Sequence, residues 1–200
     1  DIRRGKVSEK EFEQFIETSK NISELPLYID ETPAINIAAI SNRSRRIKRL
    51  FGLELIVVDY IQLMRSSGRK EYNRVQEISE ITQGLKALAK ELDVPVLALS
   101  QLSRQVEQRD NKKPQLSDLR ESGSIEQDAD VVMFVYREAY YLERKEPTLG
   151  SIEHAEWRQK MDEISSFADI MISKQRHGPT GNVQVEFEAM YTKFKNLENK

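Results

Sequence analysis

The chain has 200 residues, of which 38% are hydrophobic and 32% are charged, and its formal net charge at pH 7 is -2. A chain of this length fits one domain, and every apolar stretch is shorter than the ~20 residues that a membrane-spanning helix needs. The near balance of acidic and basic residues leaves any attraction to nucleic acid to local patches.

The residue types that are absent restrict the chemistry. The sequence contains no cysteine and only two histidines, which excludes disulfides, thiol nucleophiles and histidine-rich metal clusters. A bound metal is therefore expected to have oxygen ligands. Since the chain opens on a polar segment with no signal or transit character, we expect a cytoplasmic protein with no membrane partner, and the start at Asp1 suggests a fragment.

The first fifty residues contain two helix signals and one strand signal. Ser8 and Glu11 form a capping box that predicts a helix, and the apolar run at residues 25–29 predicts a buried strand. Thr32 and Pro33 supply a cap and a first-turn proline, which predict a second helix over residues 35–50.

The middle of the chain shows a strand, helix, strand pattern. Apolar runs at residues 53–58 and 94–99 have the length of buried strands, and apolar residues spaced by three and four over residues 75–92 predict a helix between them. Because continuous apolar runs are typical of strands covered on both faces, the fold class is predicted to be α/β, with a mostly parallel sheet flanked by helices.

Further strands are predicted toward the C-terminus. Apolar runs occur at residues 131–136 and around residues 170–172, and the segment between them, residues 139–166, is read as a surface excursion with a short helix at residues 152–161. The turn signal at residues 178–181, followed by alternating apolar residues, predicts a C-terminal antiparallel hairpin.

Polar residues at the ends of these runs are the candidate site, since ligands bind beyond the carboxyl ends of parallel strands. Asp59 follows the run Leu55-Ile56-Val57-Val58 and can hold Mg²⁺ through water, although an aspartate at this position can also just cap a turn. Gln101 follows the next run and can sense a phosphate or be an ordinary loop residue. Lys174 and Arg176 are two residues apart on an extended segment, so both side chains can reach one anion, although such pairs are often solvent-facing.

Basic segments offer a second class of candidates. The helix carrying Arg43, Arg45, Arg46, Lys48 and Arg49 is typical of a solvated face or a subunit contact more than of a nucleic-acid groove. Three polar loops, at residues 65–74, 103–115 and 117–127, have the glycine, serine and basic content that suits contacts to phosphates, although flexible loops have the same composition.

Four segments together closely resemble, in order and spacing, the successive motifs of the DnaB-type replicative DNA helicases. They are VVDYIQLM at 57–64, ALSQLSR at 98–104, SDLRESGSIEQDAD at 117–130 and KQRHGPTG at 174–181. The resemblance runs from about Ile2 to Phe194. It weakens at residues 139–166, which look longer than the family's connection, and His177 stands where many members have Asn.

The resemblance implies a RecA-like ATPase domain with a C-terminal antiparallel hairpin, which assembles into a homo-hexamer around single-stranded DNA. Asp59 resembles the carboxylate that orients Mg²⁺ through water, Gln101 the γ-phosphate sensor, and Lys174 and Arg176 the residues that a subunit supplies to its neighbour's ATP. The predicted catalytic residues are thus Gln101, Lys174 and Arg176. The loop residues with an implied role in DNA binding are Arg120, Glu121, Gly123, Arg69 and Arg104.

The family also implies 5′ to 3′ translocation, unwinding at the replication fork, primase and helicase-loader partners, and a place at the bacterial nucleoid. One departure is clear, because no Gly-x-x-x-x-Gly-Lys-Ser/Thr phosphate loop occurs and the lone Gly5-Lys6 lacks its flanking residues. We therefore expect residues 1–200 to be an N-terminally truncated motor domain that is inactive by itself. The alternatives are a DNA-binding or ring-contact module without a phosphate loop, and another RecA-like recombination ATPase.

Overall fold

The computed structural model describes residues 8–66 and 73–197, and the chain divides into two units, residues 1–33 and 34–200. The first unit contains helix α1 (Glu9–Ser23), whose N-terminus has the predicted capping box: the Ser8 hydroxyl oxygen accepts from the Glu11 N–H, and the Ser8 N–H donates to the Glu11 carboxylate. The predicted strand at residues 25–29 is wrong. These residues are exposed and pair with no strand in the described part of the chain, because an apolar run becomes a strand only beside a partner.

The second unit begins with helix α2 (Ile37–Phe51), which starts later than predicted. The cap is Asn36, whose side-chain oxygen accepts from the Ala39 N–H at 2.9 Å, and Pro33 lies in a turn instead of the first helical turn. Ala34 has a φ of 52°, a left-handed conformation that separates the Thr32–Pro33 signal from the helix. The predicted start of this helix was wrong because the chain forms a turn at residues 33 and 34 before the helix begins.

The predicted strand, helix, strand unit is confirmed. Strands β1 (Ile56–Val58) and β2 (Val96–Ala98) pair in parallel, and helix α3 (Arg74–Leu92) connects them. The apolar stripe of α3 packs with the buried side chains of β1 in one cluster. α2 lies against α3, where a Cβ at Gly84 would approach the Ile37 Cγ1 within 2.5 Å, so glycine permits the close contact.

A second sheet contains four antiparallel strands in the order β3-β4-β5-β6. It includes the predicted C-terminal hairpin of β4 and β5. The expectation of a mostly parallel sheet is therefore wrong for the described residues: two strands pair in parallel and four do not. Continuous apolar runs are typical of parallel strands, but β3 and β4 carry such runs and pair antiparallel, so the runs did not establish strand direction here. The strands are β3 (Val131–Tyr136), β4 (Phe167–Gln175), β5 (Gly181–Glu188) and β6 (Lys193–Lys195).

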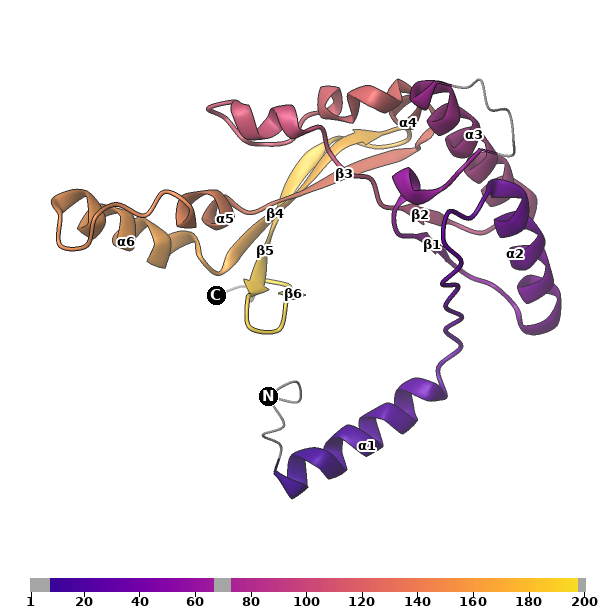
Figure 1. Cartoon of the computed structure of the whole chain (residues 1–200), viewed down its shortest axis with the longest axis horizontal. Helices are drawn as coiled ribbons and strands as arrows, with labels where there is room; N and C mark the ends of the chain where they lie inside the picture. The colour runs from indigo at the N-terminus through magenta and orange to yellow at the C-terminus, as the bar shows by residue number, and fades with distance from the viewer. Residues whose placement is uncertain (1–7, 67–72, 198–200) are drawn as a thin grey trace. The chain divides into compact units, whose positions relative to one another are not determined.

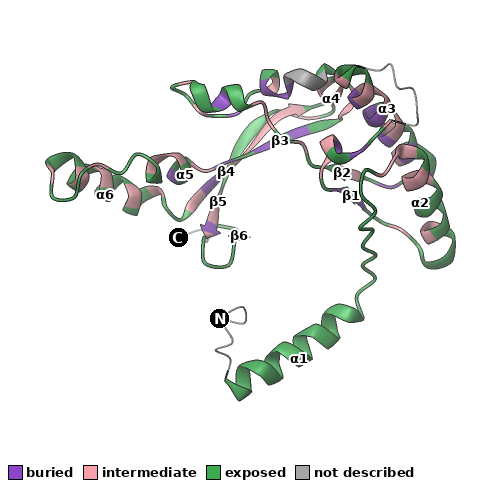
Figure 2. Ribbon diagram, viewed as in Figure 1, coloured by how far each residue is buried: buried purple, intermediate pink, exposed green. Residues whose placement is uncertain are grey.

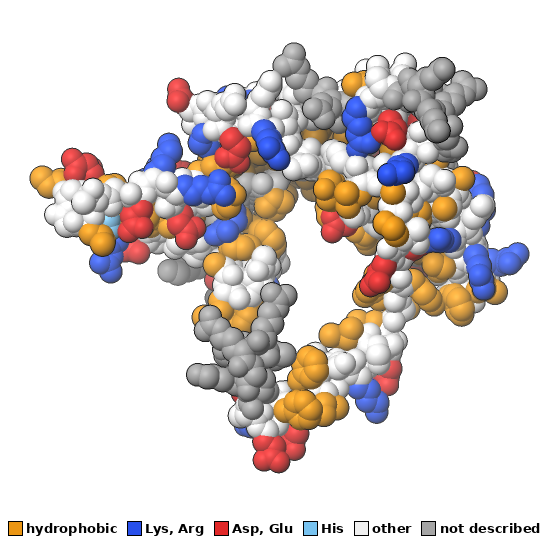
Figure 3. All heavy atoms as spheres, viewed as in Figure 1, with side chains coloured by type: hydrophobic (Ala, Val, Ile, Leu, Met, Phe, Trp, Pro, Cys, Tyr) orange, Lys and Arg blue, Asp and Glu red, His pale blue; other side chains and the backbone are white. Residues whose placement is uncertain are grey.

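Strands β1 and β3 are each buried on one face. Along β3, Val132, Phe134 and Tyr136 are buried while Met133 and Val135 are 50% and 58% exposed, an alternation that Figure 2 shows as purple and green. In β1, Val57 is 55% exposed between two buried residues. On the face shown in Figure 3, orange apolar side chains gather over the sheet regions. Coverage on both faces was expected and is wrong for the residues that the structure describes.

Short helices connect the sheets, and helix α4 touches both hydrophobic clusters through Ile125. One cluster surrounds α3 and the other contains Leu119, Val132 and Phe134. The 3-10 helices are η2 (Ile61–Leu63), η3 (Arg104–Gln108) and η4 (Leu116–Ser122), and α4 is Gly123–Asp128.

The excursion after β3 is helical. α5 (Glu138–Glu143) and α6 (Ile152–Ile164) pack on each other and extend from the end of β3 away from β1 and β2 (Figure 1). The predicted helix at residues 152–161 is confirmed and continues for three more residues. In the described residues, no helix has the length and apolar character to cross a membrane.

Candidate functional site

The carboxyl ends of β1 and β2 lie at one edge and carry Asp59 and Gln101. The backbone places them there: the Leu99 N–H donates to the Val58 carbonyl at 2.9 Å, and the Ile61 N–H donates to the Leu99 carbonyl at 3.0 Å. Both Asp59 and Gln101 are exposed. The predicted pairing of a carboxylate and an amide at one sheet edge is therefore present.

Gln62 fixes this edge and was missed by the sequence analysis. Its amide nitrogen donates to the Ser100 hydroxyl at 2.9 Å and to the Gln101 carbonyl at 3.3 Å, while its amide oxygen accepts from the Gln101 N–H at 3.2 Å. Arg74 holds the backbone of Gln62 by donating to its carbonyl at 2.7 Å. A lone glutamine three residues after an aspartate gave no signal, because these contacts join positions 38 and 39 residues apart.

The edge offers one exposed carboxylate and one exposed amide, and among the described residues it has no metal cage. The described residues contain no group of three or more His, Cys, Asp or Glu side chains that could hold a metal ion. Mg²⁺ often uses only one or two carboxylates and takes its remaining ligands from water and phosphates. An exposed Asp59 carboxylate fits that use.

Lys174 lies near the end of β4, Arg176 directly follows the strand, and both side chains reach the Gln127 carbonyl. The Lys174 ammonium donates to the carbonyl oxygens of Glu126 and Gln127, the second at 3.4 Å, and the Arg176 guanidinium donates to the Gln127 carbonyl at 3.3 Å. No contact of either cation with Asp59 or Gln101 occurs in the described part of the chain. The structure thus forms two separate pairs of the predicted residues.

The predicted DNA-binding residues lie on loops and short helices that follow the strands. Gly123 is exposed at the junction of η4 and α4, where a Cβ would meet no atom within 4 Å, so the backbone is open to a ligand. Arg104 is exposed at the start of η3. Arg69 lies outside the described residues, and Arg120 and Glu121 belong to η4 with side chains outside the description.

A hydrogen bond joins the Gln101 loop to the η4 segment. The Ser103 N–H donates to the Asp118 carbonyl at 2.9 Å, and the buried Asp118 carboxylate accepts from Arg109 at 2.7 Å and from the Gln115 N–H at 2.8 Å. Two of the three polar loops are therefore one connected structure. Asp118 is a second residue whose role was not apparent from the sequence.

The basic helix α2 is partly occupied by contacts with α3. Arg45 makes a bidentate pair with Glu91 at 2.6 and 2.8 Å, and the Lys48 ammonium donates to the Leu92 carbonyl. The guanidinium hydrogen bonds of this pair lower the pKa of Glu91. Two of the five basic residues thus attach α2 to α3, while the choice between a solvated face and a subunit contact remains a prediction for the others.

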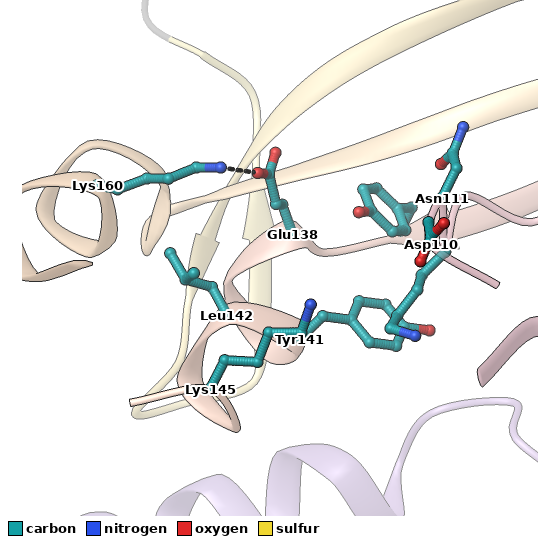
Figure 4. A pocket seen from close by; sticks show the side chains of 9 residues that line it. Asp110, Asn111, Glu138, Tyr141, Leu142, Lys145 and Lys160 are labelled. Atoms are coloured by element: carbon teal, nitrogen blue, oxygen red, sulfur yellow. Dashed lines mark ion pairs between the residues drawn. The ribbon is translucent and has the colours of Figure 1, made fainter. Parts of the chain in front are cut away.

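A pocket of about 250 Å³ lies where the excursion meets β3 and the loop after η3 (Figure 4). Lys160 pairs with Glu138 at 2.7 Å across it, and burial raises the pKa of Tyr136 and Tyr141, so both phenols stay protonated at neutral pH. None of the predicted site residues lines this pocket. Its charged lining residues are Asp110, Lys112, Glu138, Lys145 and Lys160.

Comparison with known proteins gives one consistent result. A sequence model described as the DnaB-like helicase C terminal domain matches residues 1–196. The replicative DNA helicase DnaB of Rickettsia typhi is 54% identical over 199 residues, and that of Geobacillus stearothermophilus is 47% identical over 199 residues. Each alignment covers the whole chain and 40% of the relative, so the chain spans less than half the length of these proteins.

Two solved structures also resemble this chain. One solved ATPase domain superposes with a TM-score of 0.81 at 38% identity, covering 98% of this chain and 63% of that one. A DnaB-like replicative helicase, solved in a study of its interactions with primase, superposes with a TM-score of 0.80 at 37% identity, covering 98% of this chain and 44% of that one.

Proposed function

Because this chain belongs to the DnaB-like helicase C-terminal domain family, we propose that it is part of an ATP-driven replicative DNA helicase that moves 5′ to 3′ on single-stranded DNA. The observation that carries the proposal is the family match over residues 1–196, which includes all four motifs. The same match argues against a recombination ATPase.

The proposed nucleotide site uses the edge formed by β1 and β2. Asp59 would hold the hydrated Mg²⁺, and Gln101, which hydrogen bonds from Gln62 hold in place, would donate to the γ-phosphate. When bound, the metal neutralises charge on the transferring phosphoryl group. A RecA-like core with both residues at the sheet edge is consistent with this assignment.

Lys174 and Arg176 are proposed to act on the nucleotide of a neighbouring subunit in a homo-hexamer. The separation of this pair from Asp59 in the described contacts supports a role in trans. An arginine that reaches a γ-phosphate stabilises the charge of the transition state. The complete site thus needs two copies.

The DNA contacts are proposed to involve the backbone at Gly123 together with Arg104, Arg120, Glu121 and Arg69. The openness of Gly123 supports a main-chain contact to phosphate. Contacts to the backbone carry no base information, which suits a motor that moves over any sequence. Primase is a proposed partner, since the similar helicase was studied with primase, and a helicase loader is expected from the family.

Unwinding by the full-length protein tests the proposal. A forked duplex with a free 5′ tail should be opened with ATP and Mg²⁺, while a duplex with only a 3′ tail should not. Asp59→Ala should abolish opening while leaving the protein folded, because the hydrated Mg²⁺ loses the carboxylate that positions it. Opening that persists in Asp59→Ala, or that prefers the 3′ tail, contradicts the proposal.

A further inference from the structure

Lys174 and Arg176 are bound inside their own chain by the C-terminal end of α4. Both side chains donate to the Gln127 carbonyl, and Lys174 also donates to the Glu126 carbonyl. These carbonyls belong to the last turn of a helix, where no following helical N–H donates to them, so outside cations can satisfy them.

Asp130, two residues after α4, adds a charged acceptor to the same place. Its carboxylate accepts from the Lys86 ammonium and lies 3.6 Å from the Arg176 Nε, and its carbonyl accepts from the Arg176 N–H at 2.8 Å. The hydrogen bond and the positive charge of Lys86, with smaller contributions from Arg176 and His177, lower the pKa of Asp130. Lys86 and Arg176 therefore share one anion.

A break in strand register at the end of β4 accompanies the contact. Lys174 lies opposite Val132, whereas Ile172 lies opposite Met133, so Ser173 is an extra residue on β4. A bulge of this kind re-aims the neighbouring side chains and is common beside functional sites. The bulge at Ser173 directly precedes Lys174, whose side chain reaches the end of α4.

Helix α4 is continuous with η4, and the two helices contain Arg120, Glu121 and Gly123, which are proposed to contact DNA. It follows η4 without a linker, and Ile125 packs against both hydrophobic clusters, one of which contains Leu119 of η4. The Thr82 hydroxyl also donates to the Asp128 carboxylate at 2.6 Å, which attaches α4 to α3. A displacement of the end of α4 must therefore be transmitted to residues 116–123 by packed atoms.

We propose that Glu126, Gln127 and Asp130 form a latch that holds Lys174 and Arg176 in their own subunit, and that a neighbour's triphosphate opens the latch by taking both cations. The inference rests on the proposed function of these cations in trans. The latch offers neutral carbonyls and one carboxylate that is already shared with Lys86, whereas a triphosphate offers several charged oxygens, so the exchange favours the nucleotide when it is present. Opening of the latch releases the end of α4 and changes the position of η4, which couples the nucleotide site to the DNA contacts.

The test measures how strongly nucleotide changes DNA affinity in the full-length protein. The Kd for oligo-dT is measured with and without a non-hydrolysable ATP analogue, and the ratio of the two values is the coupling. Asp130→Asn should reduce the wild-type ratio by about fivefold or more, since typical couplings are ~5- to 150-fold. Asp162→Asn, an equal charge change on the exposed face of α6, should leave the ratio unchanged.

A second variant should strengthen the latch instead of weakening it. Lys86→Met leaves Asp130 to Arg176 alone, so the latch should hold more tightly and kcat should fall several-fold. An unchanged coupling ratio in Asp130→Asn together with an unchanged kcat in Lys86→Met, in a protein whose turnover is lost in Arg176→Ala, overturns the latch and leaves the proposed function standing. Full turnover in Arg176→Ala overturns the role in trans, and the latch with it.

Discussion

At the scale of single residues, Gln62 is the side chain that holds two strand ends together. Three hydrogen bonds between its amide and residues 100 and 101 fix the position of Gln101 relative to Asp59. Gln62 therefore positions Gln101, the proposed γ-phosphate contact, although Gln62 itself is not proposed to contact the phosphate or the metal.

Replacing Gln62 tests this role. In the full-length protein, Gln62→Ala should lower kcat for ATP by about tenfold to 100-fold with a smaller change in KM, because small misplacements at a reacting centre cost up to ~10² in rate. Steady-state ATPase kinetics check this, with Gln159→Ala on exposed α6 as the control. A kcat equal to that of the wild type would mean that Gln101 keeps its position without Gln62.

The ion pair of Arg74 and Glu77 makes a residue-scale contribution that depends on pH. The Arg74 hydrogen bond at 2.6 Å lowers the pKa of Glu77 below its ordinary value. A carboxyl whose pKa is lowered by folding stabilises the folded state above its unfolded pKa, and this contribution is lost as the pH falls through the lowered pKa.

The Glu77→Gln variant should therefore lower the free energy of unfolding by up to about 1 kcal/mol at pH 7, as expected for a partly exposed pair. The difference from the wild type should shrink as the pH falls through the lowered pKa of Glu77. Urea unfolding at several pH values measures it, with the exposed Glu156→Gln as the matched control. A difference independent of pH would show that the carboxyl charge is not involved.

At the scale of elements, η4 and α4 form the segment that the proposed function assigns to DNA. Its position depends on Asp118 and Ser103 on one side and on the packing of Ile125 on the other. The segment is thus attached both to the Gln101 loop and to the core.

An Arg120→Ala change probes the segment. In the full-length protein it should weaken binding of single-stranded DNA equally for all base compositions and reduce the slope of log K against log salt by ~0.7, the value for one lost phosphate contact. Titrations over a series of salt concentrations, with oligo-dT and a mixed sequence, measure both quantities. A loss limited to one composition, or an unchanged slope, would remove Arg120 from the phosphate contacts.

At the scale of the whole molecule, the proposed site is divided between subunits. Arg176→Ala in the full-length hexamer should keep most nucleotide affinity and lose ~10³ or more in turnover, as for other arginine fingers. Mixing Arg176→Ala protomers with Asp59→Ala protomers should restore activity, because some interfaces then combine an intact Asp59 with an intact Arg176.

Subunit exchange must be confirmed first, and each variant is also mixed with the wild type. If the wild-type mixtures lose activity only in proportion to the variant added while the mixed variants show none, Arg176 acts within its own subunit. If one defective protomer abolishes the activity of an otherwise wild-type ring, all sites must be intact for turnover. The mixture of the two variants then cannot test the role of Arg176.

The sequence by itself determined the local elements and the residue types of the candidate site. The apolar stripe of α3 and the capping box of α1 depend on residues within a few positions of one another, and Asp59, Gln101, Lys174 and Arg176 are recognisable from their motifs. The family followed from four motifs in order, and the comparisons confirmed it.

The tertiary structure alone decided which elements pair and what each polar group contacts. The direction of β3 and β4, the lack of a strand partner for residues 25–29 in the described chain and the true start of α2 all depend on how the chain folds. Gln62 and Asp130 acquire their roles in the same way, because hydrogen bonds between residues 38, 39 and 44 positions apart leave no periodic trace in a sequence. Periodicity and capping are local physical effects, whereas strand direction and side-chain partners are fixed only when the chain is folded.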